Sequence, residues 1–499
     1  NFMNLSTARS AKRAKEVGIR KTLGSDRITL VKQFFFESFI FIVIAMLIGL
    51  GLTEAFRGPF NAISGKSLTF NIFSQPYILG IIVAVTIVIT LVAGSHPALY
   101  LTRFSPIQVL NEQLQSGSRR SLLRNGLVVF QFMISIGLVI CTIIVYKQLN
   151  YIQNKHLGFE KENIIILNNA WDVGVYKDAL KQAYLNSEFI VSASYATRLP
   201  SDGYGSIAQK AEGENESDHS VYVANVDYDF RETLGIEIKQ GRFFSEDFAS
   251  DSSGIVINQA AAHVFGYAGN DFKDAIGKKI EMINPNHGGR DDYEVVGVVS
   301  DFNFQGLQSE IQPLSLLLYH NTGFLTLRTK RGNQEVVLSE VEKIWKSQVP
   351  WIQFDYNFLD EKFDRTFQRE ARLGTIFSIF TVLAIIVACL GLFGLAAYTA
   401  EQRTKEIGIR KAMGASTGSL VNMLNKEFTK LVTISFVLII PISWYSMNKW
   451  LMIFAYKTNI GFWPFLAGGI IALIIAWFTV SYQSIKAAIA NPVDSLRDE

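Results

Sequence analysis

Cysteine and charge are both scarce in this chain of 499 residues, which holds 2 cysteines and 18% charged residues. Both cysteines, Cys141 and Cys389, lie in apolar runs, so the sequence excludes a disulfide framework and a cysteine-rich metal site. The net charge is only +3, which leaves no footprint of nucleic-acid binding. An ordinary soluble domain has about 25% charged residues. The composition therefore argues against one large soluble enzyme.

Apolar residues are abundant instead, at 49% of the chain, with a mean hydropathy of +0.21. A membrane-spanning helix needs about 20 mostly apolar residues. Six segments meet this requirement: Phe34–Phe56, Tyr77–Leu99, Leu123–Tyr146, Leu373–Ala397, Phe428–Trp450 and Ile460–Tyr482. Buried helices of a soluble protein would carry polar stripes at helical spacing, whereas residues 39–52 and 373–397 contain no charge at all. We therefore predict six spans.

Lysine and arginine gather in three stretches beside these spans: 9–32, 100–124 and 401–426. Short loops rich in these residues stay in the cytoplasm. All three stretches lie on one side of the membrane only if the chain crosses it six times. The short loops 57–76 and 451–459 and the long insert 147–372 are then expected outside the cytoplasm.

The insert between the third and fourth spans has the pattern of an α+β domain. Alternating and β-branched runs predict strands over 163–167, 254–258, 293–299 and 324–328, and helical patterns cover 175–185, 259–265 and 334–349. Residues 360–372 predict a charged helix, with Phe363 and Phe367 four apart, that continues directly into the fourth span. The fold class is thus an α-helical membrane protein with an α+β extracytoplasmic domain.

A basic motif occurs twice. Residues 15–25 read Lys-Glu-Val-Gly-Ile-Arg-Lys-Thr-Leu-Gly-Ser, and residues 405–415 read Lys-Glu-Ile-Gly-Ile-Arg-Lys-Ala-Met-Gly-Ala. Each copy is followed by an amphipathic stretch, a glutamate at the matching position (Glu37 and Glu427), a span, a short outer loop and a second span. Two parallel repeats follow. Since a carboxylate is costly in hydrocarbon, we expect both glutamates in an interfacial contact, with a base of the motif as the partner.

Each motif also presents a small apolar ridge beside its basic residues, formed by Ile19 and Leu23 and by Ile409 and Met413. Such a helix could lie on anionic lipid, which requires only composition. The repeated order of glutamate, glycine and arginine favours docking into a groove of a protein partner. Both interpretations remain open at this stage, with partner docking favoured.

The doubled motif resembles the coupling helix of ABC transporter permeases of the FtsX/MacB-like superfamily. The insert is similar to the extracytoplasmic core domain of that family at several runs: Val226-Asp227, Gly235-Ile236, Gly241-Arg242-Phe243-Phe244, Ile255-Val256-Ile257-Asn258, Phe265-Gly266 and the segment from Val295 to Phe302. Members of the duplicated type in this family carry two units, each with a span, an extracytoplasmic domain and a permease core. In this chain one unit is complete, while the other retains only its last two spans. We therefore expect that the sequence, which begins at Asn1, starts inside a longer protein.

The resemblance implies a domain organisation: a first coupling-helix segment (1–33), the first helix pair (34–99), a cytoplasmic linker (100–122), a span (123–146), the extracytoplasmic core domain with its stalk helix (147–372), a span (373–397), a second coupling-helix segment (398–427), the second helix pair (428–482) and a cytoplasmic tail (483–499). The residues expected to couple to the ATPase are Lys15, Glu16, Gly18, Ile19, Arg20, Lys21 and Gly24 and their equivalents Lys405, Glu406, Gly408, Ile409, Arg410, Lys411 and Gly414.

The resemblance also implies partners. We expect two copies of a separate ABC ATPase subunit, which bind ATP and Mg²⁺, membrane lipid around the spans, a periplasmic or outer-membrane partner, and a dimer or pseudo-dimer in the bacterial inner membrane. No cofactor is expected on this chain, because its one fragment of a phosphate-binding loop, Gly65-Lys66-Ser67, has Phe60 where the first glycine should be. The chain is therefore not expected to be an enzyme by itself.

Two functions remain open. The first is export or extraction of a substrate at the cell envelope, driven by movement of the outer domain. The alternative is a regulatory permease that controls an envelope hydrolase or senses antimicrobial peptides. A catalytic role of Asp227, Asp229 and Asp301, near predicted strand ends, is disfavoured, because turns and caps explain such aspartates.

Overall fold

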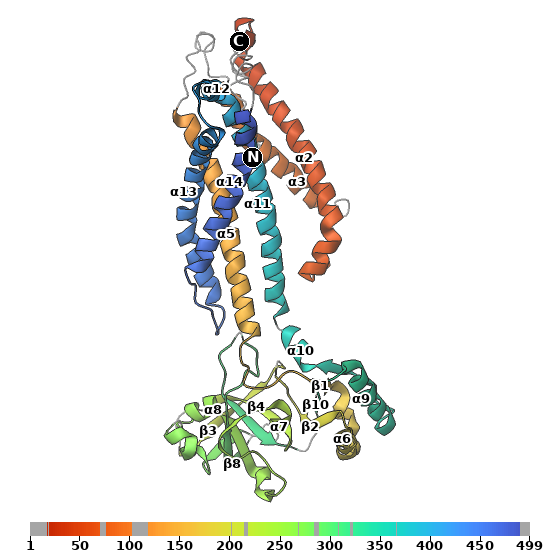
Figure 1. Ribbon diagram of the computed structural model, residues 1–499. Coiled ribbons are helices and arrows are strands. Elements are labelled where there is room, and N and C mark those ends of the chain that lie inside the picture. The colour runs from red at the N-terminus through yellow and green to blue at the C-terminus, as the bar shows by residue number, and fades with distance from the viewer. Residues whose placement is uncertain are drawn as a thin grey trace. The chain divides into compact units, whose positions relative to one another are not determined.

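The computed structural model describes residue 17 and residues 19–69, 76–101, 118–200, 202–213, 218–267, 269–283, 289–307, 309–319, 323–365 and 367–489 (Figure 1). Its contacts divide the chain into two units. The helical unit comprises Asn1–Lys147, Ala371–Trp450 and Asn459–Glu499, and the sheet unit comprises Gln148–Glu370 and Leu451–Thr458.

All six predicted spans are confirmed as long apolar helices. They are α2 (Arg27–Ser64), α3 (Pro76–Leu101), α5 (Ser118–Gln153), α11 (Gln368–Gln402), α13 (Thr417–Leu451) and α14 (Trp463–Ile489). Most of these helices extend beyond the predicted apolar segments at both ends. In these helices, basic and polar residues that flank the apolar run continue the helix.

Small and hydroxylated side chains join the helices of the helical unit. Between α5 and α11, the Ser135 hydroxyl donates to the Ala384 carbonyl at 3.2 Å, and the Thr142 and Thr381 hydroxyls lie 2.9 Å apart. In α14, a methyl group added at Gly468 would stand 2.7 Å from the Ile140 side chain of α5. Close packing at small residues is the common mode of helix association in membranes.

In the part of the sheet unit that the structure describes there are eleven strands: β1 (Ile164–Leu167), β2 (Ile190–Ala196), β3 (Gly205–Ala211), β4 (His219–Val226), β5 (Ile238–Gly241), β6 (Gly254–Asn258), β7 (Lys279–Ile283), β8 (Arg290–Val299), β9 (Leu314–Leu318), β10 (Phe324–Thr329) and β11 (Tyr356–Phe358). Its helices are α6 (Lys177–Leu185), α7 (Phe230–Leu234), α8 (Gln259–Val264), α9 (Gln334–Gln348) and α10 (Leu359–Arg365), with 3₁₀ turns at Asn168–Tyr176, Ala249–Ser253 and Asn270–Ala275. Every strand and helix predicted within the insert up to residue 349 is confirmed, with ends that shift by a few residues.

The strands follow the order β11-β1-β10-β2-β4-β3-β7-β8-β6-β9, and β9 pairs back onto β4 in parallel. This last pairing closes β4, β3, β7, β8, β6 and β9 into a barrel whose core includes Val221, Ile257 and Val298. The strands β11, β1, β10 and β2 form a second layer covered by α6 and α9, around Tyr184 and Trp345. The predicted α+β class is therefore confirmed.

The helix predicted over residues 360–372 is wrong as a single continuous element. In the described residues α10 ends at Arg365, the Phe367 amide closes a turn onto the Asp364 carbonyl at 3.0 Å, and α11 begins at Gln368. Phe363 and Phe367, on either side of this turn, are both buried, with ring centroids 5.6 Å apart. Their spacing of four serves a compact corner as well as a straight helix.

The outer loop between α13 and α14 belongs to the sheet unit over Leu451–Thr458. The Gln148 side chain donates to the Tyr456 carbonyl and accepts from the Thr458 amide, at 2.8 Å in each case. The Lys155 ammonium lies over the Tyr456 ring, 2.8 Å from its centroid. This loop is therefore held by specific contacts with the segment that enters the sheet unit.

Candidate docking surface

The second copy of the basic motif forms a short helix, α12 (Thr404–Ala412), between α11 and α13. Its inner face is buried, because Ile407 packs with Leu420 and Leu424 of α13 and with Ala488 of α14. The Lys411 ammonium donates to the Ala488 carbonyl at 2.7 Å, at the end of α14. A cation at a helix C-terminus satisfies carbonyls that lack intrahelical partners. The motif helix is thus fastened to the ends of both following spans.

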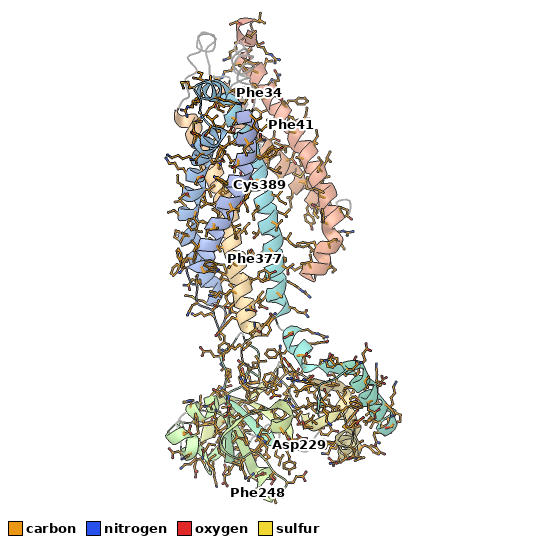
Figure 2. The ribbon with its side chains drawn as sticks, in the orientation of Figure 1. Phe34, Phe41, Asp229, Phe248, Phe377 and Cys389 are labelled. Atoms are coloured by element: carbon orange, nitrogen blue, oxygen red, sulfur yellow. The ribbon has the colours of Figure 1, made fainter. Side chains whose placement is uncertain are left out.

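The first copy repeats this packing where it is described. Residues 19–22 are helical, and Val17 packs with Leu30 and Phe34 of α2. Figure 2 labels Phe34, near the start of that helix. These three residues precede Ile407, Leu420 and Leu424 by 390 positions each. Lys15, Glu16 and Gly18 lie outside the described residues. The repeat seen in sequence is therefore also a repeat of contacts.

Both motif helices end in the same capped turn. The Ser25 amide donates to the Arg20 carbonyl and the Ala415 amide to the Arg410 carbonyl, at 2.9 Å in each copy. The glycine before each donor, Gly24 or Gly414, has φ of +93°. This is the Schellman arrangement, which favours glycine because other residues are strained at positive φ. These two glycines thus have a backbone role that does not depend on a partner.

The apolar ridge of each copy is left uncovered by the rest of the described chain. Leu23 and Met413 expose 81% and 74% of their surface, and Ile19 and Ile409 about half. Gly408, by contrast, is buried on the inner face with Ile407. The predicted ridge therefore exists in both copies, and it faces away from the helices that hold the motif.

The motif arginines occupy equivalent places in the two copies. The Arg20 guanidinium donates to the Gln33 side-chain oxygen at 2.8 Å, and the Arg410 guanidinium contacts the Met423 sulfur, at the position equivalent to Gln33. Arg410 also pairs with Glu406 at 2.8 Å, one helical turn away. Both arginines thus lie along the following helix. The side chain of Lys405 lies outside what the structure describes.

Glu427 does contact a base, although that base, Arg403, lies just before the motif 405–415 and not within it. Its carboxylate pairs with the Arg403 guanidinium, immediately before α12, at 2.5 Å. Glu427 therefore ties α13 to the start of the motif helix through an ion pair. The residue equivalent to Arg403 in the first copy, Arg13, lies outside the described residues.

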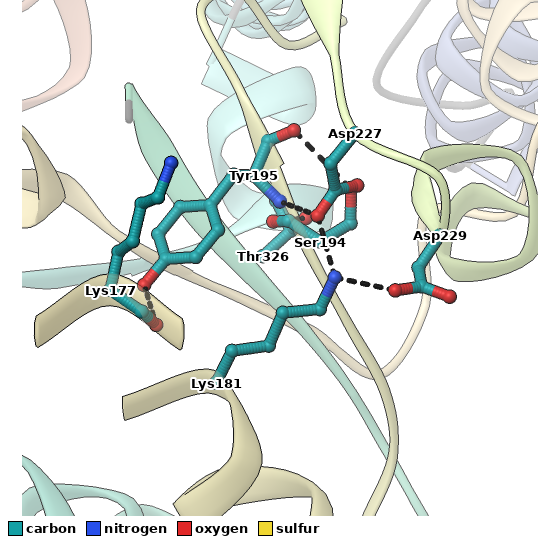
Figure 3. A network of polar contacts seen from close by, with 7 residues as sticks. All are labelled: Lys177, Lys181, Ser194, Tyr195, Asp227, Asp229 and Thr326. Atoms are coloured by element: carbon teal, nitrogen blue, oxygen red, sulfur yellow. Dashed lines mark hydrogen bonds and ion pairs between the residues drawn. The ribbon is translucent and has the colours of Figure 1, made fainter. Parts of the chain in front are cut away.

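The aspartates of the sheet unit have structural partners. Asp227 is buried at the end of β4, where it accepts from the Ser194 hydroxyl at 2.6 Å, from the Tyr195 amide at 2.9 Å and from the Lys181 ammonium at 2.7 Å (Figure 3). Asp229 contacts the same ammonium at 2.5 Å. Burial alone lowers the pKa of Lys181, but the two carboxylates outweigh it and raise that pKa overall. This cluster joins α6 to the sheet.

Asp301 has the cap role predicted for it, because its carboxylate accepts from the Ala260 amide at the start of α8, at 2.9 Å. Its burial raises its pKa. Among the described residues there is no group of three or more His, Cys, Asp or Glu side chains that could hold a metal. Sequence reasoning missed Lys181 as the partner of Asp227, since the two residues are 46 positions apart.

Comparison with known proteins adds two family matches. The model of the FtsX-like permease C-terminal family matches residues 1–106 and 378–492, and that of the MacB-like periplasmic core domain matches residues 126–343. The first pair of ranges contains both basic motifs, and the second covers most of the sheet unit.

Curated relatives include a macrolide export ATP-binding/permease protein MacB of Aggregatibacter actinomycetemcomitans, which is 24% identical over 45% of this chain and 34% of its own length. Another MacB, of Psychrobacter cryohalolentis, is 28% identical over 22% of this chain and 16% of its own. The chain thus spans about a third or less of these relatives. The crystal structure of the periplasmic region of MacB from Actinobacillus actinomycetemcomitans aligns with 42% of this chain and 94% of its own, at 17% identity and a TM-score of 0.31.

Proposed function

The chain belongs to the FtsX-like permeases with a MacB-like periplasmic core domain, and from this we propose that it couples ATP hydrolysis by separate ATPase subunits to movement of that domain. It is the membrane component of an ABC transporter in the bacterial inner membrane, and it exports or extracts a substrate at the cell envelope. ATP and Mg²⁺ are bound by the ATPase subunits, and this chain transmits their conformational change to the domain outside the cytoplasm.

One observation supports this proposal most strongly: an apolar ridge is presented twice on helices that are fastened and capped in the same way. Ile19 and Leu23 in one copy and Ile409 and Met413 in the other are exposed. An amphipathic helix that offers residues four apart is the usual form of helix-in-groove recognition. Two such helices suit two ATPase subunits, one for each motif.

Adhesion to lipid explains the ridge less well. The positive charge of Arg410 is already paired with Glu406, so this part of the motif offers little net charge to anionic headgroups. The contact of Lys411 with the end of α14 would let a push on α12 reach that span directly. The packing of Val17 and Ile407 and the capped turns repeat at the same spacing in both copies, as docking of a dedicated partner requires.

The same proposal extends to the outer side. The domain outside the cytoplasm has its own barrel and its own two-layer core, so it can move as a body when the helices move. We propose that it engages a periplasmic or outer-membrane partner, and that two halves of the permease operate as a dimer or pseudo-dimer. The relatives named for macrolide export suggest a macrolide as one cargo to test first.

The decisive experiment is co-purification of the ATPase from native membranes with the full-length protein and with the double variant Leu23→Glu/Met413→Glu. Both side chains are at least 74% exposed, so the changes should not disturb the fold. We expect the amount of co-purified ATPase to fall by at least tenfold, because a charge is placed at the centre of each docking ridge. Val175→Glu, at a sheet-unit residue that is 89% exposed, is the matched control. Undiminished ATPase on the double variant would exclude these ridges as the docking site.

A further inference from the structure

A groove of about 980 Å³ runs between α13 and α14, which lie side by side in the helical unit (Figure 1). One part of its lining is apolar and includes Ile434, Ile474, Trp477 and Phe478. The other part is polar and includes Lys426 and Lys430, which lie nearer the start of α13. The groove therefore has a cationic end and an apolar body.

The two lysines are exposed, and neither forms an ion pair with any described residue. They are one helical turn apart, so their side chains share a face of α13. Lys430 falls within the predicted apolar span, where an uncompensated cation is expensive. An anionic group from outside the chain would compensate both charges.

The first repeat provides an internal comparison. At the same offset of 390 positions, Lys426 corresponds to Phe36 and Lys430 to Ile40, and both of these apolar residues are exposed. Thr429, another residue of the groove, corresponds to Phe39. The two copies share the motif packing and the capped turn, so none of those features requires the lysines. The cationic groove therefore has a function that is specific to the second copy.

We propose that this groove binds one anionic phospholipid, with its phosphate between Lys426 and Lys430 and an acyl chain along Trp477 and Phe478. The lysines complement the headgroup, and the aromatic and aliphatic wall complements the chain. Free phosphate would use only the first of these features. The assignment goes beyond the proposed function and holds whether or not an ATPase docks on the motifs.

The test uses the full chain in detergent, titrated with phosphatidylglycerol or phosphatidylcholine that carries bromine on its acyl chains. Bromine quenches nearby tryptophan, and the difference between the unmodified protein and Trp477→Phe isolates the signal of Trp477 from that of the other tryptophans. Each lysine near an anionic surface contributes about fivefold in affinity, so we expect half-quenching by phosphatidylglycerol at about 25-fold lower mole fraction than by phosphatidylcholine.

The variant Lys426→Phe/Lys430→Ile, which installs the residues of the first repeat, should abolish the preference for phosphatidylglycerol over phosphatidylcholine. The variant Lys426→Arg/Lys430→Arg should retain that preference. Lys449→Phe/Lys457→Ile, which removes two exposed lysines elsewhere, is the control and should keep the preference. The proposal is overturned if Trp477 is not quenched, if the preference survives loss of both lysines, or if millimolar inorganic phosphate relieves the quenching.

Discussion

Gly24 and Gly414 lie 390 positions apart in the sequence and adopt the same left-handed backbone conformation, with φ of +93° in each. Each ends a motif helix, and each is followed by a residue whose amide closes the turn onto the motif arginine. The duplication thus reaches down to the single hydrogen bonds that set the direction of the chain between motif helix and span.

Replacing Gly414 by alanine should loosen the end of α12. A methyl group there would meet no atom within 4 Å, so the cost comes only from the backbone and should be about 1 to 2 kcal/mol. We expect the amides of residues 413–415 to exchange hydrogen about 5 to 30 times faster, as measured by mass spectrometry of the full chain. Gly414→Asn should be milder, because asparagine tolerates this conformation.

The control for this change is Gly418→Ala in α13, a position that also has no atom within 4 Å of an added methyl but an ordinary helical backbone. Alanine is favoured over glycine in a helix interior, so exchange near residue 418 should not accelerate. Equal acceleration in both variants would mean that the left-handed turn is not what holds the motif in place.

Reversing the charge of Arg20 and Arg410 together should abolish co-purification of the ATPase while leaving membrane insertion intact. In the second copy the change places two carboxylates one turn apart, since Arg410 pairs with Glu406, and it removes the contact with Met423. The matched control is Arg57→Glu, which reverses an arginine paired with Glu54 at the far end of α2. The assignment of these arginines fails if the double reversal still retains the ATPase at the level of the control.

The sequence was enough to predict the spans and the repeat, because both are local properties. An apolar window of 20 residues identifies a span without reference to any neighbour. A basic partner for Glu427 was also expected, since Glu37 lies at the matching position, but Arg403 lies just before the motif that was expected to supply it. The groove beside Lys426 was not predicted, because its lining comes from two different helices, α13 and α14.

The barrel and the aspartate cluster could not be predicted in this way. Strands such as β3, which reads Gly-Ser-Ile-Ala-Gln-Lys-Ala, lack clear alternation and form because β4 and β7 lie on either side. Closure depends on β4 pairing with β9, about 90 residues later. The break at Phe367 was missed because a spacing of four fits a helix and a buried corner equally well.

The sheet unit should lose stability in acid through Asp251. Its buried carboxylate accepts two N–H groups of Arg242, both at 2.7 Å, and the Ser245 amide at 2.9 Å. Burial alone would raise its pKa, but these donors lower the pKa below its ordinary value of 3.8. A carboxyl whose folded pKa is depressed stabilises the fold above the unfolded pKa, and that contribution disappears as pH falls through the folded value.

We therefore expect the free energy of unfolding of the unmodified protein to decrease when the pH is lowered below about 4, and that of Asp251→Asn to vary less with pH. At neutral pH the Asp251→Asn substitution should lower the free energy of unfolding by about 2 to 3 kcal/mol. The loss is smaller than for breaking a fully buried ion pair, because the Arg242 side chain is 35% exposed. Denaturant unfolding of the full chain at pH 3 to 7 measures both. Asp172→Asn, at an exposed position, should leave the pH profile unchanged.

Replacing Lys181 by methionine should destabilise the sheet unit far more than replacing Asp229 by asparagine. Without the ammonium, the Asp227 carboxylate remains buried with only the Ser194 hydroxyl and the Tyr195 amide as donors, at a cost of about 3 kcal/mol. The Asp229 side chain is 43% exposed, so its removal should cost less than about 1 kcal/mol. Denaturant unfolding at pH 7 measures both changes. Adding Asp227→Asn to Lys181→Met should recover part of the loss, because the buried charge is then gone, and a double variant that is less stable than Lys181→Met alone would contradict this account.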